Sequence, residues 1–261
     1  ELASLPQQIN AQYGQNLLFD SIPSVNGMNY TVSGLPAGIN NQNDYSPADS
    51  DGLLAWFDAD DNTSLVLDES NQSAVLTWLD KTGNGHDANH TDPTLVPTLF
   101  SDSLSKRNML SFENDDLLLI KNPRPMPMTL IIFGRKSGSN SDNNEFFTNS
   151  GWRIEHRGNW VLRRYNNNNP SITPPGNSPQ PSGIHSIVAW RINRFDYEMS
   201  VNGIVVNTVN SSDWHPKVNI DRMDASSSSW EMGEVLLFPF ALKAEEQNKV
   251  EGYLAHKWGL S

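Results

Sequence analysis

The chain has 261 residues, with 18 basic and 30 acidic side chains and no cysteine. The net charge of −12 argues against binding to nucleic acids and anionic membranes, which need basic patches, and the lack of cysteine excludes disulfides, cysteine–zinc sites and thiol catalysis. No apolar run reaches the roughly 18 residues of a membrane span. No signal peptide is visible at Glu1, so we interpret the chain as a mature form or an excised module.

The first half of the chain predicts short strands joined by polar loops. Within residues 1–45, the stretch "YTVSGLPAG" alternates like a strand and then breaks at its glycines. From residue 51 onward, "LLAWF", "AVLTWLD", "MLSF" and "LLLI" predict further strands, and "MTLIIFGRK" at 128–136 predicts a central strand. The length suits one large all-β domain or two ordinary domains.

The stretch "WRIEHRGNWVLRRY" at 152–165 predicts a hairpin. Because side chains alternate along strands, Arg153, Arg163 and Tyr165 would share one face. These side chains suit sugar hydroxyls or a carboxylate and are candidate ligand-binding residues. Ion pairing of the arginines with Glu155 is the alternative.

A second hairpin and a helix end the chain. Asn202 and Gly203 supply the positive φ angles of a two-residue hairpin turn within "DYEMSVNGIVVNTV". Residues 244–258 predict an amphipathic helix that docks on the strands, since apolar side chains recur there at helical spacing. The residues expected to carry this docking are Val250, Tyr253, Leu254 and Trp258.

Five stretches carry a family resemblance: "GLLAWFDADD", "WLDKTGNGHDA", "LSFENDDLLL", "SVNGIVV" and "GEVLLFPFALKAEEQNKVEGYLAHKWGL". In this order they resemble the laminin-G-like, concanavalin A-like lectin/glucanase domains of large bacterial secreted and surface proteins. The resemblance implies an all-β, two-sheet antiparallel jelly-roll sandwich with one C-terminal α-helix over residues 46–261. Lys243 departs from it, because relatives carry a Ser or Thr helix cap there.

The same resemblance bears on domain organisation and binding. Residues 1–45 resemble part of an Ig-like module, and they are too few to form a whole one, so we expect an N-terminal extension that packs on the sandwich or belongs to a split neighbouring domain. In this family, ligands bind at the loops or on the concave face, often with the help of calcium.

The segment "HDANH" differs from the zinc-binding HExxH motif by one methylene. That motif needs a helix, and here glycines and Pro93 surround the segment. On a strand, His86 and His90 would lie about 13 Å apart, too far for one metal ion. We interpret the segment and the preceding "GNG" as a tight turn with solvated acids, Asp80 and Asp87.

Two oxygen-rich loops are candidate calcium or sugar sites, since calcium prefers six to eight oxygen ligands. One lies at 58–62 and the other at 137–145, and the alternatives are an exposed acidic turn and a loop without a ligand. The candidate metal ligands are Asp58, Asp60, Asp61, Asp142 and Glu145. The candidate sugar ligands in the second loop are Asp142, Asn143 and Asn144.

The tryptophans divide into two groups by their neighbours. Trp214 and Trp230 are flanked by Ser, Asp or His and are expected to be exposed, so they are candidates for stacking on a sugar ring. The tryptophans expected in the core, because they sit in apolar strand or helix patterns, are Trp56, Trp78, Trp190 and Trp258.

The sequence does not predict an enzyme. Glucanases of the resembling fold carry E-x-D-x-x-E or E-x-D-x-E on one strand. The nearest match begins at Glu113 and lacks the third carboxylate, because Leu117 and Leu118 occupy both positions where it could stand. No G-x-S-x-G nucleophile elbow occurs either.

We therefore expect a non-catalytic recognition module of a larger bacterial extracellular or cell-surface protein, with a role in adhesion. Its expected partner is a glycan on a cell surface or matrix, with calcium as the one candidate cofactor. A peptide- or protein-binding adhesin domain and a structural spacer are the alternatives.

Overall fold

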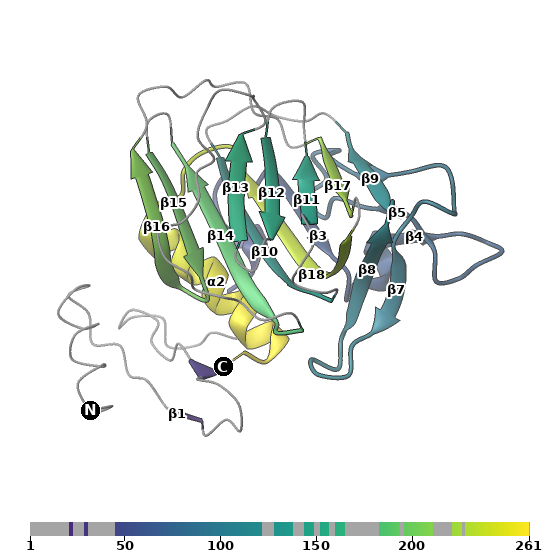
Figure 1. Ribbon diagram of the computed structural model, residues 1–261, viewed down its shortest axis with the longest axis horizontal. Helices are drawn as coiled ribbons and strands as arrows, with labels where there is room; N and C mark the ends of the chain where they lie inside the picture. Colours follow the sequence, from purple (N-terminus) through teal and green to yellow (C-terminus); the bar gives the residue numbers. More distant parts are fainter. Residues whose placement is uncertain are drawn as a thin grey trace.

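The computed structural model describes residues 21–22, 29–30, 45–121, 128–137, 144–148, 152–156, 160–164, 183–193, 196–210, 221–225 and 228–260. Two antiparallel β-sheets face each other, and the C-terminal helix α2 (Ala244–Trp258) lies against one of them (Figure 1). The predicted two-sheet antiparallel sandwich with one C-terminal helix is thereby confirmed.

The first sheet has the strand order β16-β15-β14-β10-β18-β8-β7, and β3 pairs with a further part of β18. Its members are β3 (Ala55–Asp58), β7 (Thr98–Ser101), β8 (Asn108–Asn114), β10 (Met128–Lys136), β14 (Ser186–Ile192), β15 (Asp196–Val201), β16 (Ile204–Asn210) and β18 (Ser228–Phe238). The long strand β18 thus contacts three neighbours, β3, β8 and β10.

The second sheet has the order β13-β12-β11-β17-β9-β6-β5-β4. Its members are β4 (Leu65–Leu67), β5 (Val75–Trp78), β6 (Ala88–Asn89), β9 (Leu117–Ile120), β11 (Asn144–Thr148), β12 (Trp152–His156), β13 (Trp160–Arg164) and β17 (Arg222–Asp224). Two 3₁₀ turns, η3 (Pro47–Asp49) and η4 (Asn62–Ser64), flank β3.

Strand β10 of the first sheet is buried on both faces, which explains its unbroken apolar run. Leu130 and Ile132 point into the core between the sheets, whereas Ile131 and Phe133 belong to a second cluster beneath α2. Because successive side chains of a strand point to opposite faces, a strand covered on both sides must be apolar throughout.

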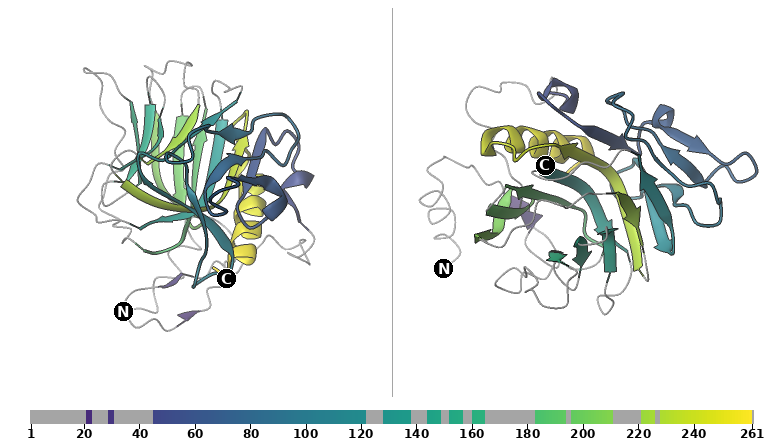
Figure 2. Two further views of the ribbon diagram at one scale, coloured as in Figure 1. Left: turned by 90° about the vertical axis from the view of Figure 1, so that its right-hand side faces the viewer. Right: turned by 90° about the horizontal axis from the view of Figure 1, so that it is seen from above.

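Helix α2 is held on the face of the first sheet that points away from the second sheet (Figure 2). Val250, Leu254 and Trp258 are buried as predicted. The Trp258 ring stacks on Phe133 with 4.4 Å between centroids, and a Cβ placed on Gly233 would come within 2.5 Å of it. Only glycine therefore fits at residue 233 beneath this ring.

Helix α2 agrees with the sequence prediction at both of its ends and differs from it at Tyr253. Lys243 makes no side-chain cap, and Gly259 ends the helix in the left-handed conformation with φ 71°. The two glutamates of the first turn lie where the helix dipole favours negative charge. Tyr253, expected to be buried, is only half-buried and meets Tyr45 edge-on, because it lies at the border of the covered face.

Residues 1–45 lie mostly outside the described part of the chain. There, β1 (Ser21–Ile22) pairs with β2 (Asn29–Tyr30) in an antiparallel two-stranded sheet. The proposed division between 1–45 and 46–261 stays a prediction. In the described segments, no helix combines the length and the apolar character needed to cross a bilayer.

Candidate functional site

The turn that follows β5 is built around the carboxylate of Asp80. Asp80 is only 7% exposed. Its oxygens accept hydrogen bonds from the backbone N–H groups of Trp56 (3.1 Å), Thr82 (3.0 Å) and His86 (3.2 Å). The expectation that Asp80 is solvated is therefore wrong, because a buried carboxylate here supplies the acceptors that the turn backbone lacks.

The glycines and histidines of this segment have structural roles. Gly83 and Gly85 have φ angles of 76° and 79°, as the tight turn requires. His86 is buried, and its Nδ1 lies 3.1 Å from the carbonyl of Lys121. His90 lies beside Asp92, whose backbone N–H donates to its Nδ1. Within the described ranges no cluster of three histidine or carboxylate side chains could hold a metal ion.

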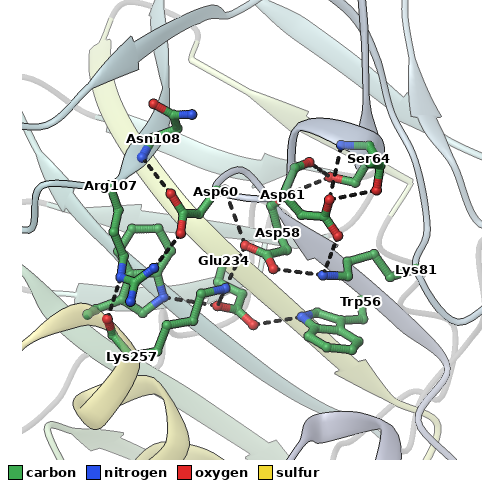
Figure 3. A network of polar contacts seen from close by, with 12 residues as sticks. Trp56, Asp58, Asp60, Asp61, Ser64, Lys81, Arg107, Asn108, Glu234 and Lys257 are labelled. Atoms are coloured by element: carbon green, nitrogen blue, oxygen red, sulfur yellow. Dashed lines mark hydrogen bonds and ion pairs between the residues drawn. The ribbon is translucent and has the colours of Figure 1, made fainter.

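The predicted calcium ligands at 58–62 lie among positive side chains (Figure 3). Asp58 accepts hydrogen bonds from Lys81 (2.8 Å) and Lys257 (2.6 Å). Asp61 also pairs with Lys81 at 2.7 Å, and this hydrogen bond lowers the pKa of Asp61 to about 2. A calcium ion would have to displace these lysines, and calcium binding at this turn stays a prediction.

The third carboxylate of this turn, Asp60, holds the turn between β7 and β8. One of its oxygens pairs with Arg107, and the other accepts the backbone N–H of Asn108 at 3.0 Å. Arg107 also donates from Nε to the carbonyl of Lys257 near the end of α2. The structure thus brings the three predicted aspartates together. Their partners are lysine and arginine side chains from the turn after β5, the turn before β8 and helix α2.

Glu234 lies at the centre of this charged network and is fully buried (Figure 3). Its carboxylate accepts hydrogen bonds from Lys257 Nζ (2.7 Å), Trp56 Nε1 (2.7 Å) and Trp258 Nε1 (2.9 Å). Burial raises the pKa of Glu234. The network joins α2 to β3 and β18, so we assign it a role in holding the fold together.

A separate groove of about 730 Å³ lies on the face of the first sheet that also carries α2. Thr98, Ser111 and Glu231 stand opposite one another across β7, β8 and β18 and form part of its floor. Residues 93–96 and the turn at 115–116 form further parts of the lining. The remaining lining residues are Asn71, Ala74, Phe100 and Glu113.

The lining combines many oxygen atoms with one aromatic ring. Four carboxylates line the groove, and no lysine or arginine is among the described residues that do so. The lining residues with a carboxylate, hydroxyl or amide are Asn71, Thr94, Thr98, Ser111, Glu113, Asp115, Asp116 and Glu231. Such groups, beside the ring of Phe100, can accept and donate hydrogen bonds to a molecule rich in hydroxyl groups.

Asp116 is the most perturbed carboxyl of this groove. Burial, with the nearby charges of Glu113 and Asp115, raises the pKa of Asp116 to about 6, although the carboxylate accepts the backbone N–H of Glu113 at 2.7 Å. A carboxyl kept in a cavity at a cost to stability is a candidate for function.

We expect Asp116→Asn to stabilise the fold near pH 7.5 and to have little effect near pH 4. With a folded pKa of about 6 against the ordinary 3.8, the carboxyl contributes its full stability below about pH 4 and loses it as the pH rises through about 6. A neutral amide avoids this loss, so the gain near pH 7.5 should be about 1–2 kcal/mol after allowance for solvent screening. Thermal unfolding at both pH values measures it.

Asp92→Asn is the matched control for this prediction. Asp92 is exposed, and the hydrogen bond from the Thr94 side chain lowers the pKa of Asp92. Its stabilising effect is present above the unfolded pKa, so the amide should not stabilise the protein near pH 7.5. Equal gains in both variants would show a general charge effect and contradict the assignment to Asp116.

Trp230 corrects one expectation about ligand binding. It is 1% exposed and points into the core from β18, where it stands opposite Phe112 of β8. Its polar neighbours face outward, because side chains alternate along the strand. Trp78, Trp190 and Trp258 are buried as predicted, whereas Trp56 is half-buried beneath Lys81.

Four of the other predicted binding residues belong to strands of the second sheet. Asn144 and Glu145 belong to β11, and Arg153 of β12 stands opposite Arg163 of β13, which confirms the predicted hairpin. Asp142, Asn143, Tyr165 and Trp214 lie outside the described residues. The assignment of these side chains to a ligand or to calcium stays a prediction.

Known proteins resemble this chain in structure rather than in sequence. No family model matches the sequence, and a search of curated proteins found no match. The binding domain of Paraclostridial Mosquitocidal Protein 1 superposes on 80% of this chain with a TM-score of 0.58 and 13% identity. This chain shares the fold of a toxin binding domain.

Two further structures extend this likeness. Domain 4 of AbnA, an extracellular arabinanase from Geobacillus stearothermophilus, was solved with arabinotriose and matches 77% of this chain and 98% of its own, with a TM-score of 0.52 and 11% identity. The ligand-binding domain of botulinum neurotoxin serotype D, solved with N-acetylneuraminic acid, matches 80% of this chain with a TM-score of 0.51 and 15% identity. This chain spans about half the length of the toxin domains, 55% and 54%.

Proposed function

We propose that the chain is a non-catalytic carbohydrate-binding module of an extracellular bacterial protein, and that the groove beside β7 and β8 holds the sugar. The observation that carries this proposal is the lining of the groove, which combines hydroxyl, amide and carboxylate groups with the aromatic side chain of Phe100. Sugar rings present hydroxyl groups at their edges and apolar C–H groups on their faces, and this mixed lining matches both.

The shared fold supports the proposal. The sandwich matches nearly the whole of an arabinanase domain that was solved with a sugar, so a module of this size can act as a unit. Two other similar structures are the binding domains of a mosquitocidal protein and of a neurotoxin, and an extracellular arabinanase domain supports an extracellular setting. The laminin-G-like and concanavalin A-like character, a role in adhesion and help from calcium form the finer part of the proposal.

Array binding on the intact chain tests this function. Glycans and peptides, including lysine-rich peptides that an acidic groove would attract, are compared in calcium and in chelator. We expect glycan binding, and a signal lost in chelator would add calcium to the site. Binding of peptides alone would replace the proposal with a peptide-binding function, and binding of neither would favour a spacer. Release of reducing ends from the bound glycan would contradict the non-catalytic role.

Groove variants locate the site. Thr98→Ala and Glu113→Gln alter exposed groove side chains, and Glu245→Gln removes a carboxylate of α2, 70% exposed, that does not line the groove. We expect the first two to weaken glycan binding several-fold with an unchanged melting temperature, and the control to bind as wild type. Equal binding by all three would place the sugar elsewhere on the molecule.

A further inference from the structure

The charges around the groove bear on the kind of sugar that it accepts. The lining carboxylates belong to Glu113, Asp115, Asp116 and Glu231, which come from β8, the turn after it and β18. A carboxylate accepts hydrogen bonds from hydroxyl groups, but it repels the carboxylate of a sialic or uronic acid. Positive side chains would be needed to recognise an acidic sugar.

Among the described residues, the guanidinium of Arg135 contacts this lining and is already engaged in ion pairs. Arg135 of β10 stands opposite Glu231 across the sheet and pairs with its carboxylate. Its Nη2 lies 3.1 Å from Oδ1 of Asp102, which is 1% exposed. Asp102 in turn accepts the backbone N–H groups of the turn at 104–105. Arg135 therefore pairs with two carboxylates, those of Glu231 and Asp102, and the buried Asp102 helps to fix the position of Arg135 and of Glu231.

This arrangement leaves the other three carboxylates of the groove without a described cation in its lining. A further negative charge in the groove would meet Glu113, Asp115 and Asp116 together, and like charges brought together at a binding surface are a strong means of rejecting a wrong partner. The net charge of −12 acts in the same direction at longer range. An uncharged sugar meets none of this repulsion.

We infer that the groove selects uncharged glycans and rejects glycans that end in a sialic or uronic acid, with Glu231, positioned by Arg135, as one fixed acceptor for sugar hydroxyls. This inference rests on the proposed carbohydrate-binding function and assigns its ligand class. It separates this chain from the serotype D domain, which was solved with N-acetylneuraminic acid. A neutral oligosaccharide such as arabinotriose fits the groove chemically.

Matched pairs of glycans test the inference. Titration calorimetry compares lactose with sialyllactose, and arabino-oligosaccharides with their uronic-acid-capped forms, at about 50 mM and about 500 mM salt. For each pair that binds, we expect the neutral glycan to bind at least about tenfold more tightly than the acidic one at low salt. The ratio of the two affinities should shrink at high salt, because salt screens the charges. Equal or tighter binding of the acidic members would overturn the inference and leave the proposed function intact.

Variants of equal net charge show whether the groove causes this selectivity. Glu113→Gln and Asp115→Asn each remove one groove carboxylate, and Glu245→Gln removes one from α2. We expect the first two to narrow the neutral-to-acidic ratio several-fold and the third to leave it unchanged. An equal change in all three would trace selectivity to total charge and overturn the role of the groove. Binding of no glycan by the folded wild-type chain would contradict the proposed function itself.

Discussion

Lys257→Met is expected to lower the free energy of unfolding by about 3–5 kcal/mol, because it leaves the buried carboxylate of Glu234 without its cation and leaves Asp58 with Lys81 as its one described lysine partner. Lys257 Nζ lies 2.6 Å from Asp58 and 2.7 Å from Glu234, which are 4% and 0% exposed. Methionine keeps most of the side-chain volume but donates no hydrogen bond. Urea denaturation near pH 7 measures the loss.

Two comparisons make this prediction specific. Lys249→Met on the same helix removes a lysine that pairs with the partly exposed Glu246, and it should cost much less than Lys257→Met because the pair lies at the surface. Adding Glu234→Gln to Lys257→Met should recover part of the stability, since the uncompensated charge is gone. A similar small loss in both lysine variants would mean that the network does not hold the helix.

The loss in Lys257→Met should also shrink as the pH falls. Burial already raises the pKa of Glu234, and removal of the lysine raises it further. A carboxyl whose folded pKa lies above its unfolded value is stabilising when protonated, so acid restores what the lost cation provided. The pH dependence thus distinguishes an unpaired charge from a simple packing defect.

Trp258→Ala should cost about 3–5 kcal/mol, because it empties a ring-sized space between α2 and the first sheet. The ring is 1% exposed, stacks on Phe133 and closes over Gly233. Differential scanning calorimetry should show a lower melting temperature and a smaller unfolding enthalpy.

Two variants calibrate this result. Trp258→Phe keeps most of the ring but loses the hydrogen bond to Glu234, so it should cost about 1–3 kcal/mol. Phe240→Ala removes a 39% exposed ring from the loop before α2 and should cost less than either. An unchanged melting temperature in Trp258→Ala would show that helix docking contributes little to stability.

Local patterns in the sequence predicted the regular elements. The helix at 244–258 and the strand at 128–136 have the bounds that their apolar spacing indicated. Asn202 and Gly203 adopt φ angles of 49° and 76°, as an Asn-Gly hairpin turn requires. These features depend on neighbours within a few residues, which is the range over which periodicity and turn chemistry act.

Features that depend on distant partners were not predicted. Lys257 and Asp58 are 199 residues apart, and nothing near either residue indicates their contact. The polar neighbours of Trp230 predict an exposed side chain, although an alternating strand places those neighbours on the opposite face and Trp230 is buried. The groove combines separate parts of the chain, and its one local signal is the alternation of Ser111 and Glu113 with Leu110 and Phe112 along β8.

The position of β18 has a consequence for synthesis of the chain. This strand pairs with β3, β8 and β10, yet it follows all three by about a hundred residues or more in the sequence. On the ribosome, the earlier strands must wait without their shared neighbour until residues 228–238 have left the exit tunnel. Such non-local pairing makes folding slow and exposes strand edges to aggregation. A chain truncated before β18 is therefore expected to be captured by chaperones and not to fold in part.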